Sequence, residues 1–409
     1  MAFSPLITRL YGPEIYGLQG VFMSIAGVMG SVAAMNYPVA IVLPESDADA
    51  VGLARLSIYV GLVISLMVTA LLYIFGTEIL YLLNAAEIVD FIYLIPVFMF
   101  FSVLSMVSGQ WLIRKKMFSL TAKVTSGQAL VINAIKAGLG FIHPTAAALI
   151  VTTTSGVFLS AVMMFFGMRK KQSCDDEKSN CSSHGLNPWQ LAKHHHDFPL
   201  LRTPQVLLNS ASHSLPVIVL AAHFGPASAG FYTIASAVLG MPMVLIGSSV
   251  MQVFYPRINE AIHRGEDAKS LIIRATVGLA LSGAVPFLVV ILAGPTLFGF
   301  VFGNEWTVAG TYAQWLSIWI FFQYINKPAV AAIPALRLQG GLLIYELFSM
   351  STKVLALYLG YKFFESDVIA IALFSLFGAI AYAWLILWVI FHSGQLSKSS
   401  EKNELQKTS

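Results

Sequence analysis

The sequence has little charge. Asp, Glu, Lys and Arg make up 11% of its 409 residues, about half of their share in soluble domains. Hydrophobic residues make up 57%, and the mean hydropathy is +0.76. A soluble globule cannot bury so much apolar surface. The composition therefore excludes a soluble protein and indicates a chain that crosses a membrane many times.

The sequence also lacks the short segments of alternating polarity that are typical of a transmembrane β-barrel. Its apolar runs are continuous and, at about 20 residues or more, long enough for helices that cross a bilayer. We therefore expect an all-α polytopic membrane protein. Its complete spans are predicted at residues 19–43, 56–83, 89–112, 122–142, 145–168, 199–223, 228–254, 272–302, 307–327, 340–363 and 367–392.

The motifs of common enzymes are absent as well. The sequence has no glycine loop for a nucleotide, no Gly-x-Ser-x-Gly elbow and no HExxH helix. Its predicted outer connections are short, whereas a membrane-bound polymerase or ligase usually carries catalytic residues on a large outer loop. We therefore expect neither an enzyme nor a bound cofactor.

Cysteine is scarce, and the two cysteines, Cys174 and Cys181, lie in one polar segment, 169–198. The same segment holds His184 and the three histidines 194–196. Their spacing matches no compact zinc-ligand pattern. We interpret the segment as a solvated linker and expect no metal site there.

Basic residues are distributed unevenly between the two sets of alternate connections. Most of the 24 Lys and Arg residues fall in the set that contains the linker 169–198 and the tail 393–409. The opposite set, which includes 143–144 and 364–366, has almost none. Since loops retained in the cytoplasm are rich in Lys and Arg, the linker and the tail are predicted to be cytoplasmic. A net charge of +4 is in this context no signal for nucleic acid.

A short turn occurs twice, about half a chain apart. RLYGPEIYG near the N-terminus has the same shape as HFGPASAGFY in the second half: residues 11–13 correspond to 224–226, and Gly17 corresponds to Gly230. A lone Gly-Pro turn is common. A turn that recurs with the same following helix and the same orientation indicates an internal duplication.

Each turn is followed by a helix of apolar and small residues and then by an exit marked by Pro44 or Pro256. Both copies run from an outer turn to an inner exit, so the duplication is parallel. We expect two pseudo-symmetric six-helix lobes around a central cavity. The lobes are predicted at 1–168 and 199–392, with the linker 169–198 between them.

Residues 9–18 fall on the outer face when the predicted helices are counted back from the cytoplasmic tail. A chain reaches that face only by crossing the membrane, so a span is expected before Arg9. Only eight residues precede it. We therefore expect the first helix of the first lobe to be largely missing.

Charged side chains at membrane depth cost a few kcal/mol each, so they tend to face a cavity or each other. Lys136 lies near the middle of its predicted helix, one turn after Asn133, and Glu346 and Lys353 are two turns apart on another. The candidate substrate-binding residues are Lys136, Arg9, Lys353, Asn133, Asn209, His213 and Glu346. Polar side chains also join helices without touching a ligand, and this alternative stays open for each of them.

Three stretches are more specific than generic membrane sequence: SPLITRLYGPEIYGLQGVF at 4–22, SGQWLIRKKMFS at 108–119, and the region 207–260 around HFGPASAGFY. With them the chain resembles the polysaccharide transporter family of bacterial O-antigen and exopolysaccharide repeat-unit flippases. That family belongs to the multidrug/oligosaccharidyl-lipid/polysaccharide exporter superfamily, whose members usually have twelve or more spans in two lobes. This sequence departs from the pattern at its first helix.

The resemblance implies a flippase of the bacterial inner membrane. Its substrate would be an oligosaccharide repeat unit on a polyprenyl diphosphate, moved by alternating access during synthesis of O antigen, capsule or exopolysaccharide. The cationic candidates would hold the diphosphate, and Asn133, Asn209 and His213 would supply hydrogen bonds. Its expected partners are membrane lipid and proteins such as a polysaccharide polymerase and a chain-length protein.

Two other functions within the superfamily stay open. A flippase for the peptidoglycan precursor lipid II would share the lobes and the ligand chemistry. A cation-coupled multidrug exporter would need an acidic cation site inside a lobe, and the only well-placed acid, Glu346, is set beside Lys353.

Overall fold

The computed structural model describes residues 3–82, 89, 91–175, 188–264, 266–336 and 338–408. All the regular structure in these ranges is helical, which confirms the all-α prediction. The chain divides into two compact units, 1–230 (unit 1) and 231–409 (unit 2). The predicted lobe boundaries at 168 and 199 differ from this division and stay a prediction.

Unit 1 contains eight helices among its described residues. They are α1 (Ser4–Val32), α2 (Tyr37–Ala40), α3 (Asp47–Leu82), α4 (Leu94–Arg114), α5 (Phe118–Ile142), α6 (Ala146–Asp175), α7 (Pro188–His194) and α8 (Thr203–Phe224), the last preceded by a π-helical turn, Phe198–Arg202. The first residues of α9 (Pro226–His263) also belong to unit 1.

Unit 2 takes in the rest of α9 and the helices that follow it. These are α10 (Ala268–Phe302), a 3-10 turn at Asn304–Trp306, α11 (Thr307–Ile325), α12 (Lys327–Ala335), α13 (Gln339–Phe364) and α14 (Asp367–Thr408).

Eight helices of the described part are long and apolar enough to cross a membrane: α1, α3, α4, α6, α8, α10, α13 and α14. α5, α9 and α11 have 25, 38 and 19 residues, which is also a spanning length. The chain is thus a polytopic helical membrane protein, as its composition predicts.

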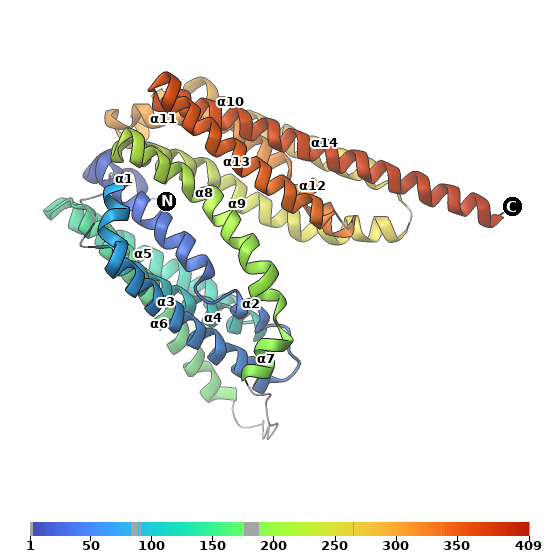
Figure 1. The fold of residues 1–409 in the computed structure, drawn as a ribbon, viewed down its shortest axis with the longest axis horizontal. Helices are drawn as coiled ribbons and strands as arrows, with labels where there is room; N and C mark the ends of the chain where they lie inside the picture. The colour runs from blue at the N-terminus through green and yellow to red at the C-terminus, as the bar shows by residue number, and fades with distance from the viewer. Residues whose placement is uncertain are drawn as a thin grey trace. The chain divides into compact units, whose positions relative to one another are not determined.

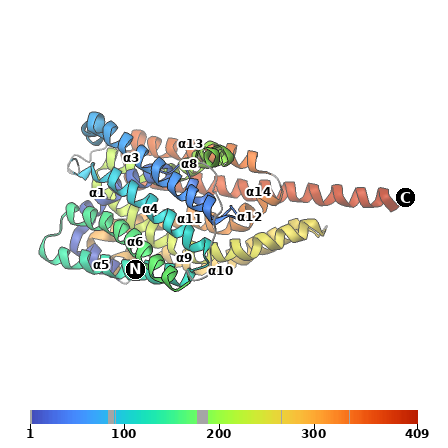
Figure 2. The same cartoon turned by 90° about the horizontal axis from the view of Figure 1, so that it is seen from below.

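In unit 1, α4 packs between α3 and α6, and α1 packs against α4, α5, α6 and α8 (Figure 1). The core beside the first turn joins Ile7 and Tyr11 of α1 to Ala137 of α5 and Leu149 of α6. In unit 2, α11 packs on α10, and α14 runs along both α11 and α13 (Figure 2). α1 is therefore central to unit 1, and α11 and α14 form the centre of unit 2.

The two copies of the Gly-Pro turn have the same backbone. Gly12 breaks α1 with φ 69° and ψ 171°, and Gly225 separates α8 from α9 with φ 90° and ψ 170°. Glycine adopts such positive φ values without steric cost, and the proline that follows each one is well placed to start the next helix. The shared geometry confirms the duplicated turn read from the sequence.

The two turns also meet each other. A β-carbon on Gly17 would overlap the carbonyl group of Pro226, and one on Gly230 would overlap the carbonyl oxygen of Pro13. Glycine allows this approach because it leaves no side chain between two helix backbones, as small residues do in membrane proteins generally. The corresponding glycines of the two copies thus hold α1 against the start of α9.

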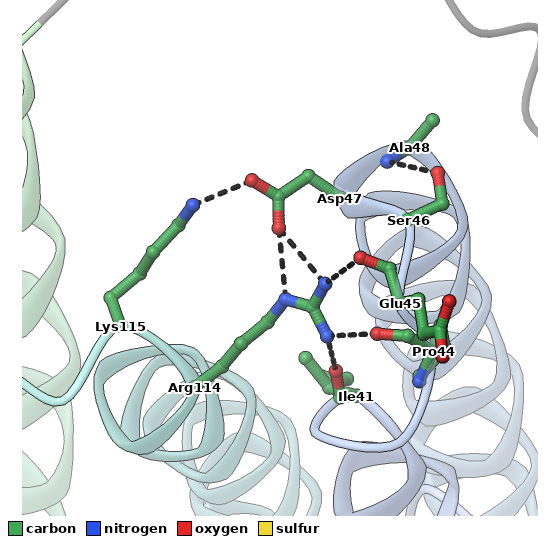
Figure 3. Close-up of polar contacts among 8 residues, drawn as sticks. All are labelled: Ile41, Pro44, Glu45, Ser46, Asp47, Ala48, Arg114 and Lys115. Atoms are coloured by element: carbon green, nitrogen blue, oxygen red, sulfur yellow. Dashed lines mark hydrogen bonds and ion pairs between the residues drawn. The ribbon is translucent and has the colours of Figure 1, made fainter.

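Arg114, at the end of α4, binds the loop that joins α2 to α3 (Figure 3). Its guanidinium donates hydrogen bonds to the Asp47 carboxylate at 3.0 Å and to the carbonyl oxygens of Ile41, Pro44 and Glu45 at 3.2, 2.5 and 3.2 Å. The fixed fork of five donors suits this arrangement of acceptors. The loop between α2 and α3 is therefore tied to the end of α4.

The second exit differs from its prediction. Pro256 does not end the helix: α9 continues seven residues further, to His263. A proline removes only one backbone donor, and the following turn is supported by an ion pair from Arg264 to Glu260 at 2.6 Å, four residues apart. In the first copy the helix is shorter than predicted. α1 ends at Val32, whereas the predicted span continues to residue 43.

Two helices continue further at their polar ends than the sequence predicts. α6 continues to Asp175 and α14 to Thr408, where the sequence predicts a linker from 169 and a tail from 393. Apolar runs mark only the part of a helix that lies in lipid, so a helix that extends into water is missed by that criterion.

The close approach of the two turns gives the first testable prediction. Gly17→Ala should lower the free energy of unfolding by about 1–3 kcal/mol, because an added methyl group forces two packed backbones apart. The matched control is Gly27→Ala in the same helix, where a β-carbon meets no atom within 4 Å and helix propensity favours alanine by about 0.5–1 kcal/mol. Thermal unfolding of the purified protein in detergent measures the stability of both variants. Equal melting temperatures for the two variants would contradict the packing described.

Candidate functional site

α5 carries a group of polar residues on one side. Asn133 and Lys136 are half-buried, and Thr125 and Ser126 are exposed on the same face two to three turns earlier. Asn133 donates a hydrogen bond to the Ala129 carbonyl at 2.7 Å. The opposite side includes three exposed apolar residues, Val131, Ile135 and Ile142. α5 thus has a lipid-compatible face and a polar face.

α8 shows a second polar stripe. Arg202, Gln205, Asn209 and His213 recur at intervals of three or four residues, so they share one face, and all are exposed. The opposite face includes Leu207, an exposed apolar residue. The helix is apolar enough to cross a membrane, yet an exposed polar stripe is costly in lipid. Such a stripe is typical of a helix that faces water or a polar ligand.

α1 connects these two helices. The Tyr11 hydroxyl donates a hydrogen bond to the backbone carbonyl of Lys136 at 2.8 Å, and α1 also packs along α8. Arg9 is exposed on α1, two residues before Tyr11. The predicted residues Arg9, Asn133, Lys136, Asn209 and His213 therefore lie on three helices of unit 1, with α1 in contact with both others.

The other two predicted residues, Glu346 and Lys353, belong to unit 2. Lys353 is only 7% exposed, and its Nζ lies 5.4 Å from the centre of the Trp319 ring, a cation–π distance. Glu346 is half-buried, and its Oε2 has no hydrogen-bond partner among the described residues. The two residues lie two turns apart on one face of α13, and within the described chain no ion pair joins them.

Sequence reasoning missed the aromatic surroundings of Glu346. The neighbouring Tyr345 stacks on Trp384 with ring centres 6.0 Å apart, and Tyr382 accepts a hydrogen bond from Gln323 at 3.0 Å. Aromatic residues are common in membrane helices, so nothing in the sequence marks these as neighbours. Gln314 of α11 donates a hydrogen bond to the Ile291 carbonyl of α10 at 2.7 Å. This bond joins two helices.

Histidines 194–196 of the predicted linker lie at the end of α7 and directly after it. No group of three His, Cys, Asp or Glu side chains gathers in the part of the chain that the structure describes. Burial, together with the neighbouring His194, lowers the pKa of His195, and His196 bonds the Lys193 carbonyl at 2.9 Å. Cys181 and His184 lie outside the described residues.

Several solved membrane transporters have a similar fold. An inward-facing multidrug-resistance transporter of the MATE family, in the MOP superfamily, superposes with a TM-score of 0.73 at 12% identity, covering 98% of this chain and 95% of that one. The lipid II flippase MurJ in an inward closed conformation gives 0.65 at 16% identity, covering 98% and 89%. A point mutant of the Vibrio cholerae MATE transporter VcmN gives 0.54 at 15% identity, covering 95% and 96%.

The family is shown by the sequence itself. Residues 6–311 match the family described as "Polysaccharide biosynthesis protein", so the chain belongs to that family, which confirms the resemblance read from its motifs. No curated protein sequence matches the chain. The family description concerns polysaccharide biosynthesis, and the solved structures that share the fold are named as transporters and a flippase.

The pair in unit 2 gives a second testable prediction. Glu346→Gln and Lys353→Met should each destabilise unit 2, because the first leaves the buried Lys353 and the second the half-buried Glu346 without an opposite charge. The double variant should be more stable than the sum of the two losses predicts, by about 0.5–3 kcal/mol. A double-mutant cycle by thermal unfolding measures this. The control cycle pairs Glu346→Gln with Lys362→Met, an exposed lysine near the end of α13, and should be additive. Equal coupling in both cycles would count against a direct interaction.

Proposed function

We propose that this protein is a flippase for oligosaccharide repeat units carried on a polyprenyl diphosphate. It would move them across the bacterial inner membrane during synthesis of O antigen, capsule or exopolysaccharide. Membership of the polysaccharide biosynthesis family supports the substrate class. The observation that carries the proposal is the pair of polar stripes on α5 and α8, helices of spanning length that present polar side chains where lipid-facing residues would be apolar.

The chemistry of such a substrate matches the stripes. Its head is anionic at the diphosphate and rich in hydroxyl groups along the sugars. A path for it needs cations at one point and hydrogen-bond donors and acceptors along its length. Lys136 and Arg9 supply positive charge in unit 1, and Asn133, Asn209 and His213 supply hydrogen bonds.

Lys353 and Glu346 would contact the substrate in only one of the protein's conformations. Lys353 is buried against Trp319, so it contacts a diphosphate only if unit 2 rearranges. Glu346 limits the positive charge that Lys353 presents. In this proposal the pair holds the substrate in one conformation only, which is the property that transport by alternating access requires.

The meeting of the duplicated turns fits this mechanism. In the proposed lobe division α1 belongs to the first lobe and α9 to the second, so the contact of Gly17 with Gly230 joins corresponding points of the two lobes. Parallel repeats of this kind transport by rocking of one repeat against the other. The contact would close one side of the path in one conformation, and the two turns would separate in the other conformation.

The basic residues give the proposed orientation. The segment 169–198 and the tail 393–409 would lie in the cytoplasm, and the duplicated turns on the outer side. Membrane lipid, a polysaccharide polymerase and a chain-length protein are the proposed partners.

A lipid II flippase is the second candidate, because MurJ, which bears that name, has a similar fold. Its ligand has the same polyprenyl diphosphate with a different sugar and peptide head. A cation-coupled multidrug exporter is the third, on the likeness to MATE transporters. Neither likeness reaches 25% identity, so each supports the fold alone.

Lys136 provides the test of this function. In a strain that lacks its own repeat-unit flippase, Lys136→Ala should reduce surface polysaccharide roughly tenfold or more, because a charge-assisted contact to the diphosphate is lost. Lys136→Arg keeps the charge and should restore part of the activity. Surface polysaccharide at matched expression is the measurement.

Lys123→Ala is the matched control, since Lys123 is an exposed cation of the same helix away from the polar face, and it should behave like the unchanged protein. Full activity of both Lys136 variants would exclude Lys136 as a substrate contact. If the unchanged chain rescues a strain depleted of its lipid II flippase but not the repeat-unit mutant, the second candidate is correct.

A further inference from the structure

Unit 1 contains an apolar pocket away from the polar stripes of α5 and α8. It lies between α3, α4 and α6 and has a volume of about 600 Å³, within the range of small-ligand pockets. Its lining includes Val51, Phe101, Trp111, Phe158 and Phe165. The hydroxyl of Ser108 is the exception in a lining that is otherwise aliphatic and aromatic.

The pocket lies toward one end of these three helices. It is bounded by the first turns of α3 from Val51, the last turns of α4 to Trp111, and the end of the apolar part of α6 at Met168. All three helices are candidate membrane spans. An apolar pocket at membrane depth accepts hydrocarbon and not water.

Positive charge gathers at the same end. Arg55 is exposed on α3, next to the lining residue Ala54. Lys115 lies 5.7 Å from the centre of the Trp111 ring and donates a hydrogen bond to Asp47 at 2.6 Å. An ammonium group has three donors, so Lys115 can bind a phosphate while it holds Asp47.

An apolar pocket with a cationic rim and a tryptophan between them matches the two ends of an anionic lipid. Tryptophan prefers the depth of the lipid headgroups, which places the pocket at acyl-chain depth and the cations at phosphate depth. Basic sites between transmembrane helices bind anionic headgroups. Since one apolar chain replaces another in the pocket, the charge at the rim decides which lipid binds.

We propose that this pocket, the α3–α4–α6 site, binds one acyl chain of an anionic phospholipid, whose phosphate is held by Arg55 and Lys115. The site is separate from the polar stripes and does not depend on the transported substrate. The lipid fills the space between α3 and α6 and so supports the end of α4, where Arg114 fixes the loop between α2 and α3.

Native mass spectrometry of the purified full chain tests the site, with phosphatidylglycerol and phosphatidylethanolamine as probes. The unchanged protein should bind one phosphatidylglycerol more tightly than phosphatidylethanolamine. Arg55→Gln should weaken that binding roughly fivefold. Ala54→Trp, which fills the pocket from its edge, should abolish it.

Two matched variants serve as controls. Arg274→Gln removes an exposed cation near the start of α10, and Ala280→Trp adds the same bulk to a half-buried alanine of that helix; both should leave phosphatidylglycerol binding unchanged. Binding by Ala54→Trp equal to that of the unchanged protein would overturn the proposal. So would an unchanged lipid preference in Arg55→Gln, or displacement of phosphatidylglycerol by an equimolar polyprenyl phosphate, which would make the pocket a site for the substrate's own chain.

Discussion

The approach of two helix backbones at Gly17 and Gly230 is the constraint on which the arrangement of unit 1 depends. It brings together the two copies of one duplicated turn, each with a glycine at positive φ followed by a proline. Because α1 is held here, Tyr11 can reach the backbone of Lys136 on α5 while the rest of α1 packs along α8. The geometry of the turn therefore places the two polar stripes on helices that share one neighbour.

The polar stripes and the α3–α4–α6 site follow from one physical rule applied in two places. A polar group in lipid must find water, a ligand or a partner, and Asn133, Lys136 and Asn209 are therefore expected along a hydrated path. An apolar pocket in lipid needs no such path, and only its charged rim distinguishes one lipid from another. The same unit thus separates a polar surface for a sugar-rich head from an apolar surface for a membrane lipid.

The membrane class, the helices and the duplicated turn could be predicted from the sequence, because apolar runs and the pairs Gly12-Pro13 and Gly225-Pro226 are local signals. The polar face of α5 was also predictable from the spacing of Asn133 and Lys136. The contact of Gly17 with Gly230, the bonds from Arg114 to the α2–α3 loop, and the burial of Lys353 against Trp319 were not. Each depends on segments far apart in the chain, and no local pattern reports which helices become neighbours. The sequence also does not predict that α9 continues through Pro256, because a proline more often marks the end of a helix.

Thiol accessibility in the membrane shows whether the stripes on α5 and α8 face a hydrated path. In a chain with Cys174→Ser and Cys181→Ser, cysteine would be placed at Lys136 or Asn209, and for comparison at Val131 or Leu207 on the opposite faces of the same helices. A water-soluble, membrane-impermeant maleimide should label Lys136→Cys and Asn209→Cys and spare Val131→Cys and Leu207→Cys. Labelling of the apolar positions as fast as the polar ones, or of none of the four, would show that the two stripes do not face water.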